Sequence, residues 1–224
     1  MIQAIETRYA GCRFRSRLEA RWAVFFDTLG ITWEYEPQGF ENRFWCDCDK
    51  PENWKFTNGR QCTGKHERYL PDFFLPGTKT WVEVKGEEGR LLEKAAFYTE
   101  MLDWGGQLPG VAESYGNSGG LLVLGPVPRV ERRSSAPLHS ALQHHKGVCR
   151  VFMEFEQSGP SYVGDDGWDH ESWADASCGG EYPEPGEYPY TGTTWHTSRR
   201  VDTVVQRAYT AARSARFEHG ESGA

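Results

Sequence analysis

An apolar residue recurs every three or four positions between residues 14 and 30, which predicts an amphipathic helix. Its apolar face consists of Leu18, Trp22, Phe25, Phe26 and Leu29. Ser16 is a favourable residue for capping a helix N-terminus, and Gly30 is favourable just beyond a C-terminus. The helix is therefore expected to begin just after Ser16 and to end at Gly30.

Shorter patterns predict the remaining elements. Polar and apolar residues alternate up to Pro37, which predicts a strand whose exposed face carries Glu34 and Glu36. Residues 68–86 read as two strands joined by a Pro-Gly turn. The other predicted elements are a helix at 90–104, a buried strand at 121–124, a strand at 148–155, a loop at 157–197 and a final helix at 198–218.

The order helix, strand, strand, strand, helix, strand predicts a compact α/β unit with a mixed sheet. We assign residues 1–130 to this core, which a polar, Cys-rich loop at 41–68 interrupts. Residues 131–224 are assigned to a C-terminal extension. This extension is expected to contain an acidic loop region at 151–198 and a basic helix at 198–218.

Charge is distributed unevenly along the chain, whose formal net charge is −7. Residues 151–198 contain ten of the 32 acidic residues and no Lys or Arg, which leaves 22 acids against 25 bases elsewhere. The overall acidity therefore does not exclude a local basic groove for DNA. The chain has neither a signal-like start nor a run of 18 apolar residues, so we expect a cytoplasmic protein without a membrane partner.

The predicted hairpin carries charged side chains where apolar ones would be expected. With the turn at 77–78, Asp72 lies directly opposite Glu83, where two like charges are destabilising. Lys85 falls on the same face as Glu83, because side chains alternate along a strand. Mg²⁺ binds carboxylate oxygens and would turn this repulsion into attraction. The pattern predicts a metal site for phosphodiester hydrolysis, in which Lys85 positions water and balances charge.

The segments Pro71-Asp72 and Glu83-Val84-Lys85, with the order of elements around them, resemble the PD-(D/E)XK nuclease superfamily. Glu19 matches the acidic residue that Holliday-junction-resolvase-like and transposase-endonuclease-like members carry on the first helix. The wider pattern, over residues 8–128, is similar to small nuclease-like proteins carried by actinobacterial phages.

This resemblance implies a restriction-endonuclease-like core of order αβββαβ, with a mixed central sheet flanked by helices. It implies a deoxyribonuclease whose Mg²⁺ or Mn²⁺ is bound by Asp72, Glu83, the Val84 carbonyl and Glu19. Lys85 would position the nucleophilic water. The expected substrate is phage or host DNA, branched or structured DNA included, in the cytoplasm of a bacterial host. Such relatives often dimerise to cut two strands, so a homodimer and a monomer both stay open.

Two parts of this site have a simpler explanation. Ser16 and Glu19 fit a capping box, in which the Glu side chain hydrogen-bonds back to the start of the helix. The pair of Glu83 and Lys85 fits the solvated polar face of a surface hairpin. These alternatives compete with the metal site at the level of sequence.

Three cysteines and a histidine in the insertion have a spacing that indicates a structural zinc site. They are Cys46, Cys48, Cys62 and His66. Zinc bound by three thiolates and an imidazole would organise a loop that is too polar to fold alone. The alternative is free surface thiols beside an unrelated histidine.

Basic residues cluster around the first helix, and Arg13, Arg15 and Arg17 are candidates for contacts with DNA phosphates. The alternative is an ordinary solvated helix face. The leading hypothesis is thus a metal-dependent DNA endonuclease. Its alternatives are a non-catalytic scaffold with a nuclease-like fold and a zinc-dependent nucleic-acid-binding protein.

Overall fold

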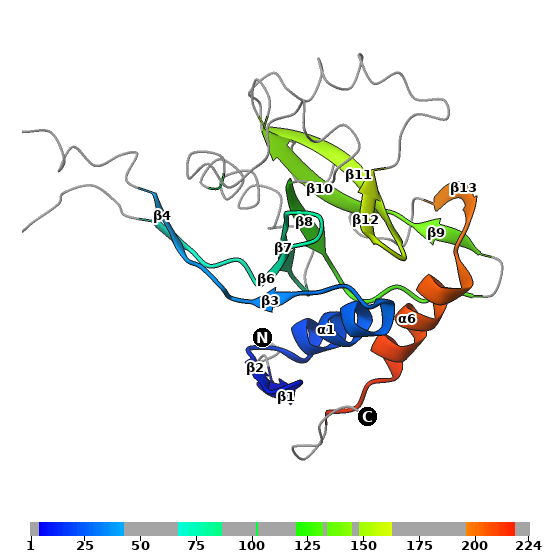
Figure 1. Cartoon of the computed structure of the whole chain (residues 1–224), viewed down its shortest axis with the longest axis horizontal. Coiled ribbons are helices and arrows are strands. Elements are labelled where there is room, and N and C mark those ends of the chain that lie inside the picture. The colour runs from blue at the N-terminus through cyan, green and yellow to red at the C-terminus, as the bar shows by residue number, and fades with distance from the viewer. Residues whose placement is uncertain are drawn as a thin grey trace, which may run out of the picture.

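The computed structural model describes residues 5–42, 67–86, 102, 120–131, 134–144, 148–162 and 196–217. They form a mixed α/β structure with a curled mixed sheet and two helices, α1 (Arg17–Leu29) and α6 (Thr203–Ser214) (Figure 1). Neither helix in this part of the chain is long and apolar enough to cross a membrane.

Seven strands form the main sheet, in the spatial order β12-β11-β10-β8-β7-β6-β3. In chain order they are β3 (Glu34–Tyr35), β6 (Phe73–Leu75), β7 (Thr80–Val84), β8 (Gly120–Leu124), β10 (His139–His144), β11 (Val148–Glu156) and β12 (Gly159–Tyr162). Strands β7 and β8 are parallel, and the other neighbours are antiparallel. Parallel neighbours need a crossover connection. The helix predicted at 90–104 falls in that connection and lies outside the described residues, apart from the fully buried Leu102.

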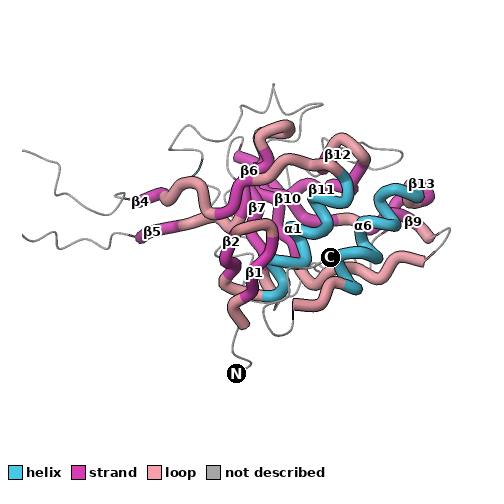
Figure 2. The backbone as a smooth tube through the Cα atoms, turned by 60° about the horizontal axis from the view of Figure 1, so that its bottom comes forward, coloured by secondary structure: helices cyan, strands magenta, loops and turns pink. Residues whose placement is uncertain are grey.

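Three antiparallel pairs complete the described strands. They are β1 (Thr7–Tyr9) with β2 (Cys12–Phe14), β4 (Phe40–Asn42) with β5 (Glu67–Tyr69), and β9 (Ser135–Pro137) with β13 (His196–Arg200). The β4–β5 ribbon points away from the sheet and helices in both views (Figures 1 and 2). The residues predicted to bind zinc follow β4, at positions 43–66, and lie outside the described part of the chain.

Helix α1 begins and ends where the sequence predicts. The Ser16 hydroxyl accepts a hydrogen bond from the Glu19 N–H at 3.2 Å, and so caps the N-terminus. Gly30 ends the helix with φ at 75°, a left-handed conformation that glycine adopts at little cost. The buried residues of α1 are Glu19, Ala20, Trp22, Ala23, Phe25, Phe26 and Leu29. All are apolar except Glu19.

Helices α1 and α6 lie side by side against one face of the sheet (Figures 1 and 2). The fully buried Trp22 is central to this core, where its ring packs against Phe155 of β11 and Tyr209 of α6. Its Nε1 donates to the Gly125 carbonyl at 2.8 Å, so the indole is both packed and hydrogen-bonded. These contacts fix α1, and therefore the residues at its N-terminus, relative to the sheet.

The structure corrects the sequence prediction in the C-terminal half. Strands β11 and β12 form a hairpin of the main sheet, so the acidic region predicted as a loop at 151–198 begins with strands. The last helix starts at Thr203 and not at residue 198, because Asp202 caps it through the Val204 N–H and β13 pairs with β9. Residues beyond 130 thus contribute three strands and α6 to the same sheet and core.

His139 is a buried polar residue of this core. Its side chain lies against Trp22 and Phe155, and its Nε2 is 2.7 Å from the Tyr209 hydroxyl. Burial lowers the pKa of His139 from its usual value of 6.5 to about 3, because the imidazolium would be poorly solvated there. The folded protein therefore keeps His139 neutral across the physiological range.

This depressed pKa predicts that the protein loses stability in mild acid. The unfolded chain binds a proton at His139 below about pH 6.5 whereas the folded protein does not, so unfolding becomes more favourable as the pH falls toward 3. Between pH 6.5 and 5 the loss at this residue should be about 1.5 kcal/mol. In urea unfolding, the difference in stability between wild type and His139→Gln should shrink by about this amount. Parallel pH profiles for the two proteins would contradict the prediction.

Candidate active site

The β6–β7 hairpin has the register that the turn predicts. Phe73 pairs with Val82, and Leu75 pairs with Thr80. Continued by one residue, this register places Asp72, directly before β6, opposite Glu83. Val82 and Val84 belong to the core between sheet and helices, so Glu83 is on the other face of β7.

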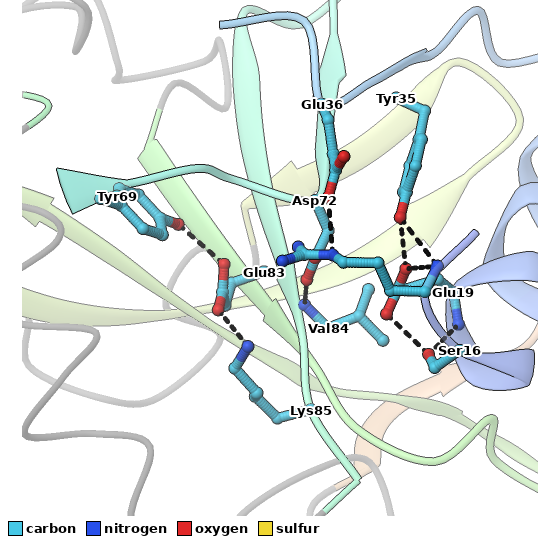
Figure 3. Close-up of polar contacts among 10 residues, drawn as sticks. Ser16, Glu19, Tyr35, Glu36, Tyr69, Asp72, Glu83, Val84 and Lys85 are labelled. Atoms are coloured by element: carbon cyan, nitrogen blue, oxygen red, sulfur yellow. Dashed lines mark hydrogen bonds and ion pairs between the residues drawn. The ribbon is translucent and has the colours of Figure 1, made fainter. Parts of the chain in front are cut away.

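Asp72 joins three separate segments of the chain (Figure 3). Its main-chain carbonyl accepts from the Glu36 N–H at 3.0 Å, just after β3. Its side-chain Oδ2 accepts from the Val84 N–H at 2.6 Å. Its Oδ1 accepts from Nη2 of Arg15 at 2.7 Å. The pairing of β6 with β7 begins at Phe73 and Val82, so β6 offers no partner to the buried Val84 N–H. The Asp72 side chain accepts this hydrogen bond instead.

The Asp72 side chain is only 2% exposed, and the groups around it shift the pKa of its carboxyl. Burial is the main cause that raises its pKa from 3.8 to about 7, and the charge of Glu83 raises it further. Glu19 acts in the same direction, whereas Lys85 and the Val84 N–H act in the opposite one. The elevated pKa therefore reflects mainly the loss of hydration on burial, to which the nearby negative charges of Glu83 and Glu19 add.

Glu83 has two donors at its own end of the site (Figure 3). Nζ of Lys85 is 2.5 Å from Oε1, and the Tyr69 hydroxyl donates to Oε2 at 3.0 Å. The Glu83 side chain is 3% exposed and that of Lys85 is 40% exposed. The pair is therefore not the fully solvated one that a surface hairpin would carry, since a buried carboxylate meets a partly exposed ammonium.

Glu19 occupies the position of a capping-box residue at the start of α1. Its Oε1 accepts from the Ser16 hydroxyl at 2.7 Å, and its Oε2 accepts from the Tyr35 hydroxyl at 2.7 Å. The same Oε2 accepts the Arg15 N–H at 3.1 Å. Glu19 thus hydrogen-bonds back to the start of the helix as the capping alternative expects, but its donors are the Ser16 hydroxyl and the Arg15 N–H, one residue before the N–H that a capping box uses. Glu19 also lies near enough to Asp72 to raise the pKa of that carboxyl.

Glu36 was not predicted as a site residue from the sequence, and Arg15 was predicted as a contact to DNA and not to Asp72. Glu36 was assigned to an exposed strand face, but its φ of 46° ends β3 and turns the chain toward Asp72. Nε of Arg15 lies 2.6 Å from Glu36 Oε1, so Arg15 connects Glu36 with Asp72. The alternation of polar and apolar residues could not reveal this contact, because β3 ends at Tyr35 and Glu36 no longer has strand geometry.

The three arginines predicted to contact DNA have different surroundings. Arg13 forms an exposed ion pair with Glu6. Arg15 is engaged inside the site, as described. The Nε of Arg17 is buried without a hydrogen-bond partner among the described residues. The structure brings Arg15 alone of these three into contact with the carboxylates.

The carboxylates suit a hard divalent cation, although they do not surround one point. No group of three or more acidic, histidine or cysteine side chains in the described ranges is arranged to hold a metal ion. Mg²⁺ commonly uses only one or two carboxylates and completes its shell with water and substrate phosphate. Asp72 and Glu83 provide that number of carboxylates, and the side chains of both are buried. The donor set therefore fits Mg²⁺ or Mn²⁺.

No model of a known protein family matches this chain, and no curated protein or solved structure matches it. What the site can do is therefore inferred from its own residues.

If a divalent cation binds at Asp72, removal of this carboxylate should affect stability in a metal-dependent way. Since the folded pKa of Asp72 is raised, its contribution to stability is lost as the pH rises from 3.8 through about 7, and the ionised form is unfavourable at pH 8. Asp72→Asn keeps an acceptor for the Val84 N–H and removes the charge. In EDTA at pH 8 we expect this variant to melt at the wild-type temperature or higher.

Addition of Mg²⁺ should raise the melting temperature of wild type and not that of Asp72→Asn. Asp27→Asn is a suitable control, because Asp27 accepts hydrogen bonds from Tyr9 and Trp33 away from the site. Mg²⁺ should stabilise this control as it does wild type. Equal stabilisation of all three proteins by Mg²⁺ would place the metal elsewhere.

Proposed function

We propose that this protein is a metal-dependent deoxyribonuclease that hydrolyses phosphodiester bonds at the end of the β6–β7 hairpin. The observation that carries the proposal is a pair of buried carboxylates, Asp72 and Glu83, with the Lys85 ammonium against Glu83. Like charges that face each other in a protein interior are costly, and groups with strongly shifted pKa values cluster at functional sites.

The order and direction of the elements support the proposal. Helix α1 precedes three antiparallel strands, β3, β6 and β7, and a crossover then leads to β8, parallel to β7. Apart from the second helix, which falls outside the described residues, this is the order of elements that the resemblance to the PD-(D/E)XK superfamily implies for residues 8–128. It favours a restriction-endonuclease-like core, with β10 to β12 extending its sheet.

Each residue of the proposed site has a distinct role. Asp72 and Glu83 would bind Mg²⁺ or Mn²⁺, with the Val84 carbonyl and Glu19 as further donors, directly or through water. A metal held there would supply Lewis-acid activation of the phosphate and acidify bound water. Lys85 is anchored by Glu83 yet 40% exposed, so its ammonium can orient water or stabilise negative charge on the phosphate.

A non-catalytic scaffold is the second candidate, and one observation favours it. Every oxygen of the Asp72, Glu83 and Glu19 carboxylates already has a donor within the protein. The cluster is thus hydrogen-bonded without a metal. It differs from an inert network in that two buried carboxylates, Asp72 and Glu83, repel each other, which an amide side chain at position 72 would avoid.

A nuclease assay tests this proposal. Supercoiled plasmid and a four-way DNA junction would be incubated with the protein in Mg²⁺, Mn²⁺ or EDTA. We expect metal-dependent cutting by wild type, and a rate at least 100-fold lower for Lys85→Ala, because loss of a group that stabilises transition-state charge commonly costs about that factor. Lys79→Ala, an exposed change in the turn of the same hairpin, should cut like wild type.

The outcomes separate the two candidates. Cutting that Lys79→Ala retains and Lys85→Ala loses would support the nuclease. A folded wild-type protein that binds DNA but cuts neither substrate with either metal would favour the scaffold. Cutting by Lys85→Ala at the wild-type rate would exclude this hairpin as the active site.

A further inference from the structure

The guanidinium of Arg15 is in the position of a counter-ion for the carboxylates of the site. Its Nη2 lies 2.7 Å from Oδ1 of Asp72, and its Nε lies 2.6 Å from Oε1 of Glu36. The contact with Asp72 is a hydrogen bond and that with Glu36 is an ion pair, so the planar guanidinium pairs with two acids at once. A monovalent cation thus contacts the same carboxylate that the proposed function gives to a divalent one.

The main chain of Arg15 is held in place while its side chain is accessible. The Arg15 N–H donates to Glu19 Oε2 at 3.1 Å and to the Tyr35 hydroxyl at 3.0 Å. Its side chain is 54% exposed, whereas the Asp72 side chain that it contacts is 2% exposed. The guanidinium can therefore move toward solvent without movement of the backbone before α1.

We propose that a divalent cation displaces the Arg15 guanidinium from Asp72, and that the displaced guanidinium then binds a phosphate of the DNA. This inference rests on the proposed function. A guanidinium and a divalent cation repel each other at one carboxylate. Phosphate offers the displaced group an equivalent partner, because arginine binds phosphate through two parallel hydrogen bonds as it binds carboxylate. Glu36 stays beside Arg15 and keeps it near the site.

Arg15 is then a positioning residue that couples metal binding to DNA binding. Without DNA it competes with the metal, and with DNA it contributes to the phosphate contact. Metal should therefore strengthen DNA binding, and DNA should strengthen metal binding to the same extent. Glu36, whose left-handed backbone brings its carboxylate to Arg15, helps to define where the displaced guanidinium lies.

Two binding measurements on the full chain test this inference. Calorimetry with Mn²⁺ in the absence of DNA gives the metal affinity of wild type, Arg15→Gln, Arg15→Lys and Arg129→Gln. Anisotropy of a fluorescein-labelled duplex, in Ca²⁺ or in EDTA, gives the effect of a divalent cation on DNA affinity. Arg129→Gln is the matched control, since it removes the same charge from an exposed pair with Glu131 that has no part in the proposed site.

We expect Arg15→Gln to bind Mn²⁺ roughly fivefold tighter than wild type or more, because the competing cation is gone. Its DNA affinity should no longer rise when Ca²⁺ replaces EDTA. Arg15→Lys keeps the charge but cannot bridge two acids in the same way, so its Mn²⁺ affinity should lie between those of wild type and Arg15→Gln. Arg129→Gln should keep the wild-type metal affinity and the wild-type coupling.

A merely structural role for Arg15 predicts the opposite change in metal affinity. If wild type binds Mn²⁺ and cuts DNA but Arg15→Gln binds Mn²⁺ equally or more weakly, the inference is overturned and the nuclease proposal stands. The inference is also overturned if Ca²⁺ strengthens DNA binding by Arg15→Gln as much as by wild type. If wild type neither binds Mn²⁺ nor cuts DNA, the proposed function fails, and the inference fails with it.

Discussion

A carboxylate that is almost completely buried loses its hydration, so its charge must be met by groups inside the protein. At Asp72 those groups are the Val84 N–H and the Arg15 guanidinium, and the nearby charge of Glu83 opposes them. The position of Asp72 depends in turn on β3, because its carbonyl accepts the Glu36 N–H. The geometry of the site therefore follows from the need to provide hydrogen-bond donors to the buried Asp72 from several segments of the chain.

The rest of the fold holds the groups that contact Asp72 in place. The hairpin register sets Asp72 against Glu83, and a shift by one residue would move Glu83 to the core face. Trp22 and its aromatic neighbours hold α1 against the sheet, which fixes the capped N-terminus that carries Ser16 and Glu19. Glu19 links this N-terminus to the site, since it accepts a hydrogen bond from the Ser16 hydroxyl of the cap and adds negative charge near Asp72.

Local rules made part of this site predictable from the sequence. Capping and termination preferences gave the ends of α1, and turn chemistry gave the register that places Asp72 opposite Glu83. The bridge from Arg15 to Asp72 joins positions 57 apart in the chain, which no local pattern contains. Glu36 was misplaced because a positive φ ended the alternation early. Strand β13 was missed because it pairs with β9, which is distant in the sequence. Strand β12 forms a hairpin with β11, and was missed because it begins with Gly159 and Pro160, residue types that are typical of turns.

The central claim is that the end of this hairpin binds a divalent metal. Paramagnetic Mn²⁺ broadens the NMR signals of nuclei close to it, so a titration of ¹⁵N-labelled protein locates the ion without reference to catalysis. The amide signals of Asp72, Glu83, Val84 and Lys85 should broaden at the lowest Mn²⁺ concentrations, and should not do so in Asp72→Asn. Broadening that starts at other acidic residues, or that is unchanged in Asp72→Asn, would contradict the metal site and the function derived from it.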